Sequence, residues 1–399
     1  MTPAARPRLW LARLTLSAFR CYARTALETD SRPVVLCGPN GAGKTNLLEA
    51  LSLLAPGRGL RRAKLSEVIR TDSGGSAPAA RTWAVAARIE TPDGPRDIGT
   101  GRDPTSGEDT ASERRLVRID GAPVRGQQGL SEILSLVWLT PQMHSLLREA
   151  PGARRRFLDR LVYGFDPAHA GRVAAYEQSL RERARLLKLG RADDAWLSAL
   201  EDSMARHGVA IAAARRALVA RLGAACARQE SAFPVAGLDL EGEVEAWLDQ
   251  GPALMAEDRL RAQLAQDRAR DGETGGAAAG PHRADLIVRH VERGVAADQC
   301  STGEQKALLI SIVLAHTRLL TLERGAPPLL LLDEVAAHLD ARRRAALYRE
   351  LLALGAQAWL TGTEAAVFAP LGDAAQFLRV ENAELAPMSA ADNDGNETI

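Results

Sequence analysis

The stretch Gly38-Pro39-Asn40-Gly41-Ala42-Gly43-Lys44-Thr45 decides the fold of this chain, because it fills every fixed position of the pattern G-x-x-x-x-G-K-[ST]. The apolar residues 34–37 before it predict a short buried strand. The spacing after it predicts one face of a helix, at Leu47, Leu48, Leu51 and Leu54. In this context, backbone N–H groups and the positive end of the helix hold the phosphates of a nucleotide. Lys44 adds a full positive charge, and Thr45 offers its hydroxyl to Mg²⁺.

A second part of the same site is predicted near the end of the chain. Residues 329–332 are four leucines, which is typical of a fully buried strand, and Asp333 and Glu334 follow directly. Open parallel sheets bind their ligands at this carboxyl edge. We assign Asp333 to Mg²⁺ together with Thr45, and Glu334 to the attacking water. The alternative is that both acids only end a strand.

The segment Cys300-Ser301-Thr302-Gly303-Glu304-Gln305 precedes an apolar helix and predicts a second helix N-terminus suited to an anion. Ser301 lies close to Asp333 in the sequence, whereas a long insert separates it from Lys44. That insert is longer than the coupling ATPase of a transporter needs. It is also much shorter than the continuous heptads of a cohesin-like protein.

Composition narrows the class of protein. Hydrophobic residues make up 46% and charged residues 25% of the chain, and the formal net charge is +1, so a uniformly basic coat for nucleic acid is excluded. The four cysteines stand far apart without a C-x-x-C pair, which argues against a zinc site or a disulfide framework. No stretch reaches the roughly 18 apolar residues of a membrane span. We expect a soluble, cytoplasmic protein without a membrane partner.

The pattern changes from strand to helix in the middle of the chain. Residues 82–89 and 115–119 predict strands of a second sheet, joined by a polar, glycine-rich connection over 91–112. From about residue 130, apolar residues recur every three or four positions, which is typical of stacked helices. The predicted divisions are 1–130 for the first part of lobe I, 131–280 for a helical lobe II with a short arm, 281–387 for the rest of lobe I, and 388–399 for a disordered acidic tail.

Two basic clusters are candidates for contact with DNA. The first follows the phosphate loop and comprises Arg58, Arg61, Arg62 and Lys64. The second lies in segment 148–191, which has a local charge of +6 and includes Arg154, Arg155 and Arg156. A solvated turn is the alternative for the first cluster. A solvated helical face, which lacks interleaved aromatic residues, is the alternative for the second.

The order of these motifs resembles the ATP-binding-cassette heads of DNA-repair and chromosome-structure ATPases. Within that group the chain resembles the RecF family of bacterial recombination mediators over essentially its full length. The most specific matches are Phe19-Arg20-Cys21-Tyr22, Thr140-Pro141-Gln142, the segment 151–160 and Gly280-Pro281-His282-Arg283-Ala284-Asp285-Leu286. The resemblance implies an α/β P-loop NTPase of ABC-ATPase type, with a mixed sheet core, an inserted and mainly helical second lobe, and no long coiled coil. His282, Arg283 and Asp285 either form a structural turn or contact ATP or DNA.

The resemblance also implies that two heads enclose two ATP molecules with Mg²⁺. Ser301 and Gly303 of one subunit would contact the γ-phosphate held by Lys44 of the other, and Asp340 would line that interface. Gln142 would join the γ-phosphate and the metal to the helical lobe. The expected catalytic residues are therefore Lys44, Gln142, Ser301 and Glu334.

The implied function is ATP-dependent binding of a homodimeric clamp to single-stranded, gapped or double-stranded DNA. The clamp would support recombinase loading and SOS induction with recombination mediator proteins of the same pathway. Thr361 and Thr363 stand where transporters place a switch histidine, so we expect weak, DNA-stimulated hydrolysis. The alternatives are the energy-coupling subunit of a transporter and a nucleotide-binding structural partner without turnover.

Overall fold

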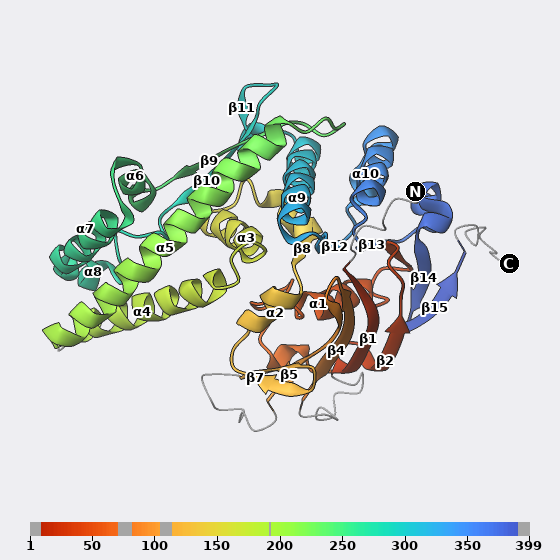
Figure 1. Ribbon diagram of the computed structural model, residues 1–399, viewed down its shortest axis with the longest axis horizontal. Helices are drawn as coiled ribbons and strands as arrows, with labels where there is room; N and C mark the ends of the chain where they lie inside the picture. The colour runs from red at the N-terminus through yellow and green to blue at the C-terminus, as the bar shows by residue number, and fades with distance from the viewer. Residues whose placement is uncertain (1–8, 71–81, 104–113, 191–192, 390–399) are drawn as a thin grey trace. The chain divides into compact units, whose positions relative to one another are not determined.

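The computed structural model describes residues 9–70, 82–103, 114–190 and 193–389. The chain divides into two compact units, one formed by Met1–Met143 with Thr317–Ile399 and the other by His144–His316 (Figure 1). The predicted insertion of a helical lobe into an α/β lobe therefore holds, but its boundaries differ from the predicted 131 and 280. Most of the predicted acidic tail lies outside the described residues.

The boundaries differ because strand pairing, which is non-local, decides them. Strand β8 (Leu136–Leu139) pairs with β12 (Leu329–Leu332), so it belongs to the first unit although it follows the predicted boundary. Strand β10 (Asp285–His290) pairs with β9 (Ala236–Glu241), so the chain remains in the second unit beyond residue 280. The Ser301 segment consequently belongs to the second unit.

The first unit contains a mixed six-stranded sheet in which the pairs are parallel except at one edge. In spatial order its strands are β15 (Glu384–Met388), β14 (Gln376–Glu381), β3 (Val34–Cys37), β13 (Ala358–Gly362), β12 and β8. The four strands from β3 to β8 are completely buried, which is why their sequences are short apolar runs without alternation. Helix α1 (Lys44–Ser52) follows β3, and α10 (Ala341–Leu354) connects β12 to β13.

An antiparallel sheet of six strands completes the first unit. Its order is β2 (Tyr22–Glu28), β1 (Trp10–Phe19), β4 (Ala84–Thr91), β5 (Gly94–Arg102), β6 (Arg115–Ile119) and β7 (Ala122–Val124). Its inner face shares one hydrophobic core with α1 and the mixed sheet, as Leu14, Leu47 and Val34 illustrate. Strand β5 lies inside the predicted connection, so that prediction was wrong there. The strand contains three glycines, and only Ile98, Thr100 and Arg102 are buried, which leaves a weak strand pattern.

The second unit is mainly helical. Helices α4 (His169–Leu189) and α5 (Asp194–Ala227) pack against each other along their lengths, and α5 also contacts α7 (Ala253–Gln266). The remaining elements are α3 (Pro151–Tyr163), α6 (Glu243–Gln250), α8 (Arg268–Thr274) and the small sheet of β9, β10 and β11 (Val295–Ala296). At 34 residues, α5 is the longest helix in the described part of the chain, and that part contains no long coiled coil.

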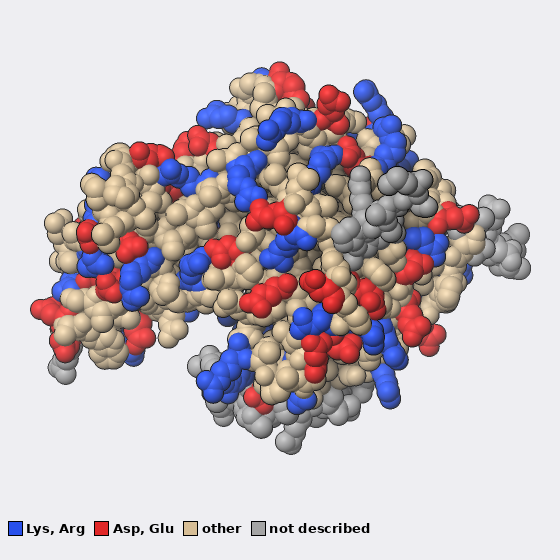
Figure 2. Space-filling view, viewed as in Figure 1, with Lys and Arg blue, Asp and Glu red and all other residues tan. Residues whose placement is uncertain are grey.

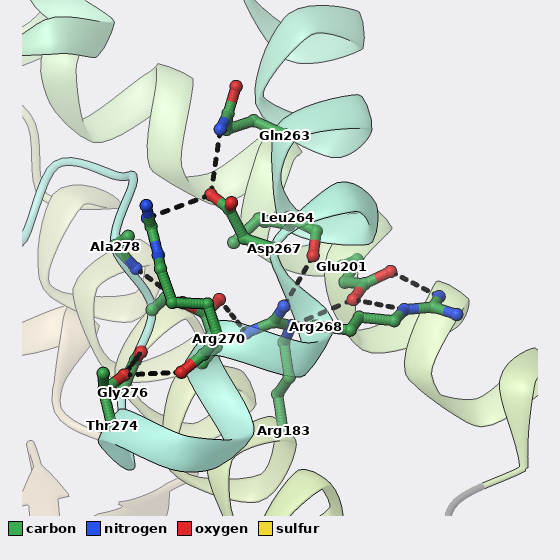
Figure 3. A network of polar contacts seen from close by, with 12 residues as sticks. Arg183, Glu201, Gln263, Leu264, Asp267, Arg268, Arg270, Thr274, Gly276 and Ala278 are labelled. Carbon is green, nitrogen blue, oxygen red and sulfur yellow. Dashed lines mark hydrogen bonds and ion pairs between the residues drawn. The ribbon is translucent and has the colours of Figure 1, made fainter.

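A buried ionic network joins four helices of this unit (Figure 3). Arg183 of α4, which is 1% exposed, donates to Glu201 of α5 at 2.9 Å and to Asp271 of α8 at 2.8 Å. Its third bond, of 2.6 Å, goes to the Leu264 carbonyl at the end of α7. Arg268 contacts both carboxylate oxygens of Glu201, at 2.9 and 2.6 Å. Two arginines therefore balance two buried acids, and Arg183 contributes nothing to a basic surface.

Helix α9 (Thr302–Arg324) is the single candidate membrane span among the described residues, judged by length and composition. Of its most apolar window, 78% is buried inside the protein. This degree of burial is the property of a core helix, in which apolar side chains are covered by protein rather than by lipid.

Candidate nucleotide-binding site

The carboxyl ends of four neighbouring strands gather the predicted motifs of the first unit at one sheet edge. Cys37 of β3 pairs in register with Gly362 of β13, and Leu332 of β12 pairs with Leu360 of β13 and Leu139 of β8. The phosphate loop, the Thr361 segment, the acidic pair and the Gln142 segment follow these strands in that spatial order. Parallel pairing therefore brings together four segments that are far apart in the sequence.

Two glycines of the phosphate loop are required by their surroundings. Gly38 has a φ of +155°, and a Cβ atom there would lie 2.0 Å from the Val380 carbonyl oxygen. Gly43 has a φ of +117°, and a Cβ atom there would lie 2.9 Å from the Tyr22 hydroxyl. That hydroxyl donates a 3.2 Å hydrogen bond to the Gly43 carbonyl. The antiparallel sheet, through Tyr22, thus holds the loop where it enters α1.

Lys44 is bound to its own loop in this structure. The Nζ atom donates to the Gly38 carbonyl at 2.5 Å and to the Pro39 carbonyl at 2.8 Å. Burial lowers the pKa of Lys44, whereas the nearby charges of Glu334 and Asp333 act in the opposite direction. The ammonium group and the two acids therefore belong to one electrostatic site.

Thr45 and Asp333 lie together as expected for a shared metal ion. The Thr45 hydroxyl is 3.1 and 3.2 Å from the two carboxylate oxygens of Asp333. Burial raises the pKa of Asp333, so the buried carboxylate gains from a positive charge beside it. Among the described residues no group of three or more His, Cys, Asp or Glu side chains could hold a metal. Two oxygen donors fit Mg²⁺, which takes few protein ligands and fills its other positions with phosphate and water.

Thr361 organises the acidic pair, a role that the sequence reasoning missed. Its buried hydroxyl donates to an Asp333 carboxylate oxygen at 2.8 Å and accepts a 2.8 Å bond from the Glu334 backbone N–H. Glu334 has a φ of +51°, which is unusual for a residue other than glycine, and it is partly exposed. The sequence placed Thr361 near the carboxyl end of a strand, but its contacts to Asp333 and Glu334 depend on the pairing of β12 with β13.

Two further predicted residues lie on exposed segments. Gln142 is exposed on the single helical turn Pro141–Ser145 that follows β8. Asp340 caps α10, since its carboxylate accepts a 2.8 Å bond from the Arg343 backbone N–H. Asp340 therefore caps its own helix, and its role at a subunit interface stays a prediction.

The Ser301 segment is a capping box at the start of α9 in the second unit. The Ser301 backbone N–H and hydroxyl each donate 2.9 Å bonds to a carboxylate oxygen of Glu304, and the Glu304 N–H donates back to the hydroxyl at 3.3 Å. The bonds from Ser301 lower the pKa of Glu304, which also pairs with Arg293. Ser301, Thr302 and Gly303 are exposed, and nothing lies within 4 Å of a Cβ atom built at Gly303.

One member of the first basic cluster, Arg61, binds other residues of the first unit. Arg61 donates to Asn46 at 2.8 Å and to Glu49 at 3.3 Å, both on α1. Glu49 is buried and also binds Arg20 through two bonds of 2.9 and 2.7 Å. Arg61 therefore helps to neutralise a buried acid of the phosphate-loop helix. The other three members, Arg58, Arg62 and Lys64, are exposed.

Most arginines of the second basic cluster are bound to acids or carbonyl groups of the second unit. Arg154 makes a bidentate pair with Asp285 at 2.7 and 2.6 Å, and Arg155 donates to the Ala284 carbonyl at 2.5 Å. Arg156 is exposed. Other positive charges in the segment pair with acids of the same unit, namely Arg172 with Asp166, Arg181 with Glu177, Arg183 with Glu201 and Asp271, and Arg185 with Glu182. Figure 2 accordingly shows acidic and basic side chains mixed over the visible face.

The Gly280 to Asp285 segment forms a turn held inside the second unit, whereas the predicted alternatives were a turn linking the two lobes or a contact to ATP or DNA. His282 binds the Tyr176 hydroxyl through Nδ1 at 2.7 Å and the Ala277 carbonyl through Nε2 at 2.9 Å. Burial lowers the pKa of His282 to about 4, in agreement with a neutral ring that accepts from the tyrosine. A Cβ atom at Gly280 would lie 2.2 Å from the Tyr176 hydroxyl, so glycine is required there.

Comparison with known proteins agrees with this geometry. Residues 10–382 match the family described as RecF/RecN/SMC N terminal domain. The protein named DNA replication and repair protein RecF from Mesorhizobium japonicum is 48% identical over 96% of this chain and 98% of its own length. Its counterpart from Rhizobium rhizogenes is 47% identical over 94% of this chain and 97% of its own length.

Solved structures show the same fold. The recombination mediator protein RecF in its ATP form, from the RecFOR pathway, has a TM-score of 0.78 at 22% identity, covering 96% of this chain and 100% of its own. The Smc head domain from Pyrococcus furiosus has a TM-score of 0.53 at 15% identity, covering 96% of each chain. The fold is that of a P-loop, ABC-type ATPase head, and the chain belongs to the RecF family of DNA replication and repair proteins.

Proposed function

We propose that this protein binds ATP with Mg²⁺ at the carboxyl edge of its mixed sheet and uses the nucleotide to close a homodimer on DNA. The observation that carries the proposal is the convergence of Lys44, Thr45, Asp333 and Glu334 on one sheet edge. A RecF structure with ATP shares this fold. The relatives named as DNA replication and repair proteins support the DNA-linked role.

The ground-state contacts define what each residue does when nucleotide binds. Lys44 exchanges two neutral carbonyl acceptors for phosphate oxygens, which are stronger partners for an ammonium group. Thr45 and Asp333 hold Mg²⁺, which when bound neutralises charge on the phosphates. Thr361 fixes the backbone of Glu334 by a 2.8 Å bond, so that its carboxylate orients the attacking water and accepts its proton.

A single phosphate loop covers only one side of a triphosphate, and the remaining phosphate oxygens need donors from elsewhere. Ser301 and Gly303 supply them from the partner subunit, because they form an exposed helix N-terminus whose first turn favours an anion. Asp340 and Gln142 complete the interface from exposed positions. ATP thereby stabilises the dimer, and hydrolysis releases it.

The exposed basic residues are the candidates for contact with DNA, namely Arg58, Arg62, Lys64 and Arg156. We infer a clamp on single-stranded or gapped DNA that acts with other recombination mediators in recombinase loading and SOS induction. Hydrolysis is weak and DNA-stimulated, because Thr361 is already used to position the acidic pair and Thr363 offers only an exposed hydroxyl.

Light scattering after size exclusion, with and without ATP and gapped DNA, tests the proposal. Wild-type protein should form a dimer only with ATP, and Glu334→Gln should keep ATP bound and accumulate as the dimer. Lys44→Met should stay monomeric, and Glu384→Gln, a change at an exposed acid on β15, should behave as wild type. A dimer that forms equally without ATP, or DNA affinity that ATP does not change, would refute the clamp.

A further inference from the structure

The first unit contains a pocket of about 300 Å³ that none of the nucleotide motifs lines. It lies at the amino ends of two strands of the mixed sheet, because Ser135 precedes β8 and Pro327 precedes β12. The nucleotide motifs follow the carboxyl ends of those same strands. The pocket is therefore a separate site, and part of its lining comes from α2 (Gln128–Ile133) and from the turn between β4 and β5.

In the described part of the chain, one positive charge in this pocket has no carboxylate in direct contact with it. Arg324, in the last turn of α9, donates from one terminal nitrogen to the Ser131 carbonyl at 2.8 Å. Among the described residues it makes no other side-chain hydrogen bond and no direct ion pair. Burial lowers the pKa of Arg324, and the charge of the neighbouring Glu323 acts in the opposite direction. By contrast, the second arginine of the lining, Arg96, pairs with Asp120 at 2.7 Å.

A buried hydroxyl in the same lining also lacks a partner. Ser135 is 7% exposed, and its Oγ atom has no hydrogen-bond partner. A buried hydroxyl without a partner costs free energy that a ligand acceptor would recover. The lining therefore offers the remaining N–H groups of Arg324 and the hydroxyl of Ser135 as donors, within the part of the chain that the structure describes.

We propose that this pocket binds a single carboxylate carried on a short apolar stem, as in a peptide glutamate side chain or a free short-chain monocarboxylate. Arg324 and Ser135 would hold the carboxylate, and Ile133, Ala326 and Pro327 supply apolar walls for the stem. Asp93 and Glu132 are exposed members of the lining, and their charge opposes dense anions such as phosphate.

Three elements connect the region of the pocket with segments that carry nucleotide motifs. Helix α9 ends at Arg324 and begins beside Ser301, while β8 and β12 lead from the pocket to Gln142 and Asp333. A bound carboxylate thus contacts the far ends of three elements that carry nucleotide motifs. This inference does not depend on the proposed clamp, because binding is measured without ATP or DNA.

Saturation-transfer NMR on the full chain tests the pocket with four probes. These are an acetylated and amidated tripeptide with a central glutamate, the same peptide with glutamine, butyrate, and inorganic phosphate. The glutamate peptide or butyrate should bind at least about tenfold more tightly than the glutamine peptide or phosphate. The glutamine peptide lacks the charge-assisted bond, and the acids of the lining oppose the higher charge of phosphate. The stronger of the two carboxylates identifies the source.

Variants locate the binding. Arg324→Gln should weaken carboxylate binding about tenfold or more. Ser135→Ala should weaken it about threefold while the fold is unaffected, because its hydroxyl has no partner to lose. Arg118→Gln, at an exposed arginine of β6 outside the lining, should bind as wild type. Equal binding of the two peptides, phosphate binding as tight as carboxylate binding, or affinity unchanged in both Arg324→Gln and Ser135→Ala would overturn the proposal.

Discussion

Replacing Thr361 by valine tests whether one buried hydroxyl positions the acidic pair. The side chain is 1% exposed, and valine has nearly the same shape, so the change removes the hydroxyl with little repacking. The Glu334 N–H loses its acceptor, which costs about 1–3 kcal/mol, and Asp333 loses a donor to a charged group, worth about 1.5–3 kcal/mol. The added buried methyl returns about 0.8 kcal/mol.

The expected net loss in the free energy of unfolding is about 2–5 kcal/mol. For a unit of this size a loss of about 3 kcal/mol lowers the midpoint of thermal unfolding by roughly 6–12 °C. Calorimetry measures this shift, and an ATPase assay follows turnover, which should fall because Asp333 is harder to keep charged and Glu334 is no longer held.

Two control variants separate the hydroxyl from the rest of the side chain. Thr361→Ser keeps the hydroxyl and loses one buried methyl, at a cost of about 1 kcal/mol. Thr363→Val changes an exposed threonine two residues further on and should leave stability unchanged. If Thr361→Val were as stable and as active as Thr361→Ser, the hydroxyl would not position the acids, and this reasoning would be refuted.

Arg183→Met should cost about 3–5 kcal/mol in urea unfolding, because it leaves Asp271 buried without its cation, whereas exposed Arg185→Met should cost less than about 1 kcal/mol. His282 and His316, whose folded pKa values are both about 4, should each remove about 3 kcal/mol of stability as the pH falls from roughly 6.5 to 4, since the unfolded chain binds a proton on each ring that the folded chain does not. His282→Gln should therefore halve the fall over this range. Arg156→Gln should weaken DNA binding and reduce the slope of log K against log salt concentration by about 0.9, with stability unchanged. Arg154→Gln should instead destabilise the fold, because it leaves Asp285 unpaired. Equal effects of the two variants on stability would contradict this assignment.

Patterns that depend on neighbouring residues could be read from the sequence. The phosphate loop lies between a buried strand and a helix as predicted, because glycine positions and apolar spacing are local constraints. Asp333 and Glu334 likewise follow a buried strand. Their proximity to Lys44 could also be expected, since parallel sheets align the carboxyl ends of their strands.

Strand β5 and the boundaries of the two units could not be predicted from neighbouring residues in the sequence. Strand β5 has few apolar residues, and it is a strand because β4 and β6 pair with it on both sides. The second unit extends beyond residue 280 because β10 pairs with β9, which lies about forty residues earlier. Such pairings are set by partners distant in the chain.

The charged residues show most clearly the difference between what the sequence determines and what the tertiary structure decides. The sequence by itself determined the number of basic residues in segment 148–191 and the nucleotide motifs, because both depend only on residue identity and spacing. Tertiary structure alone decided that Arg154 pairs with Asp285, that Arg183 is buried among acids, and that Thr361 holds Asp333. The physical reason is that the free energy of a charge or hydroxyl depends on what surrounds it after folding, and those surroundings come from elements far away in the chain.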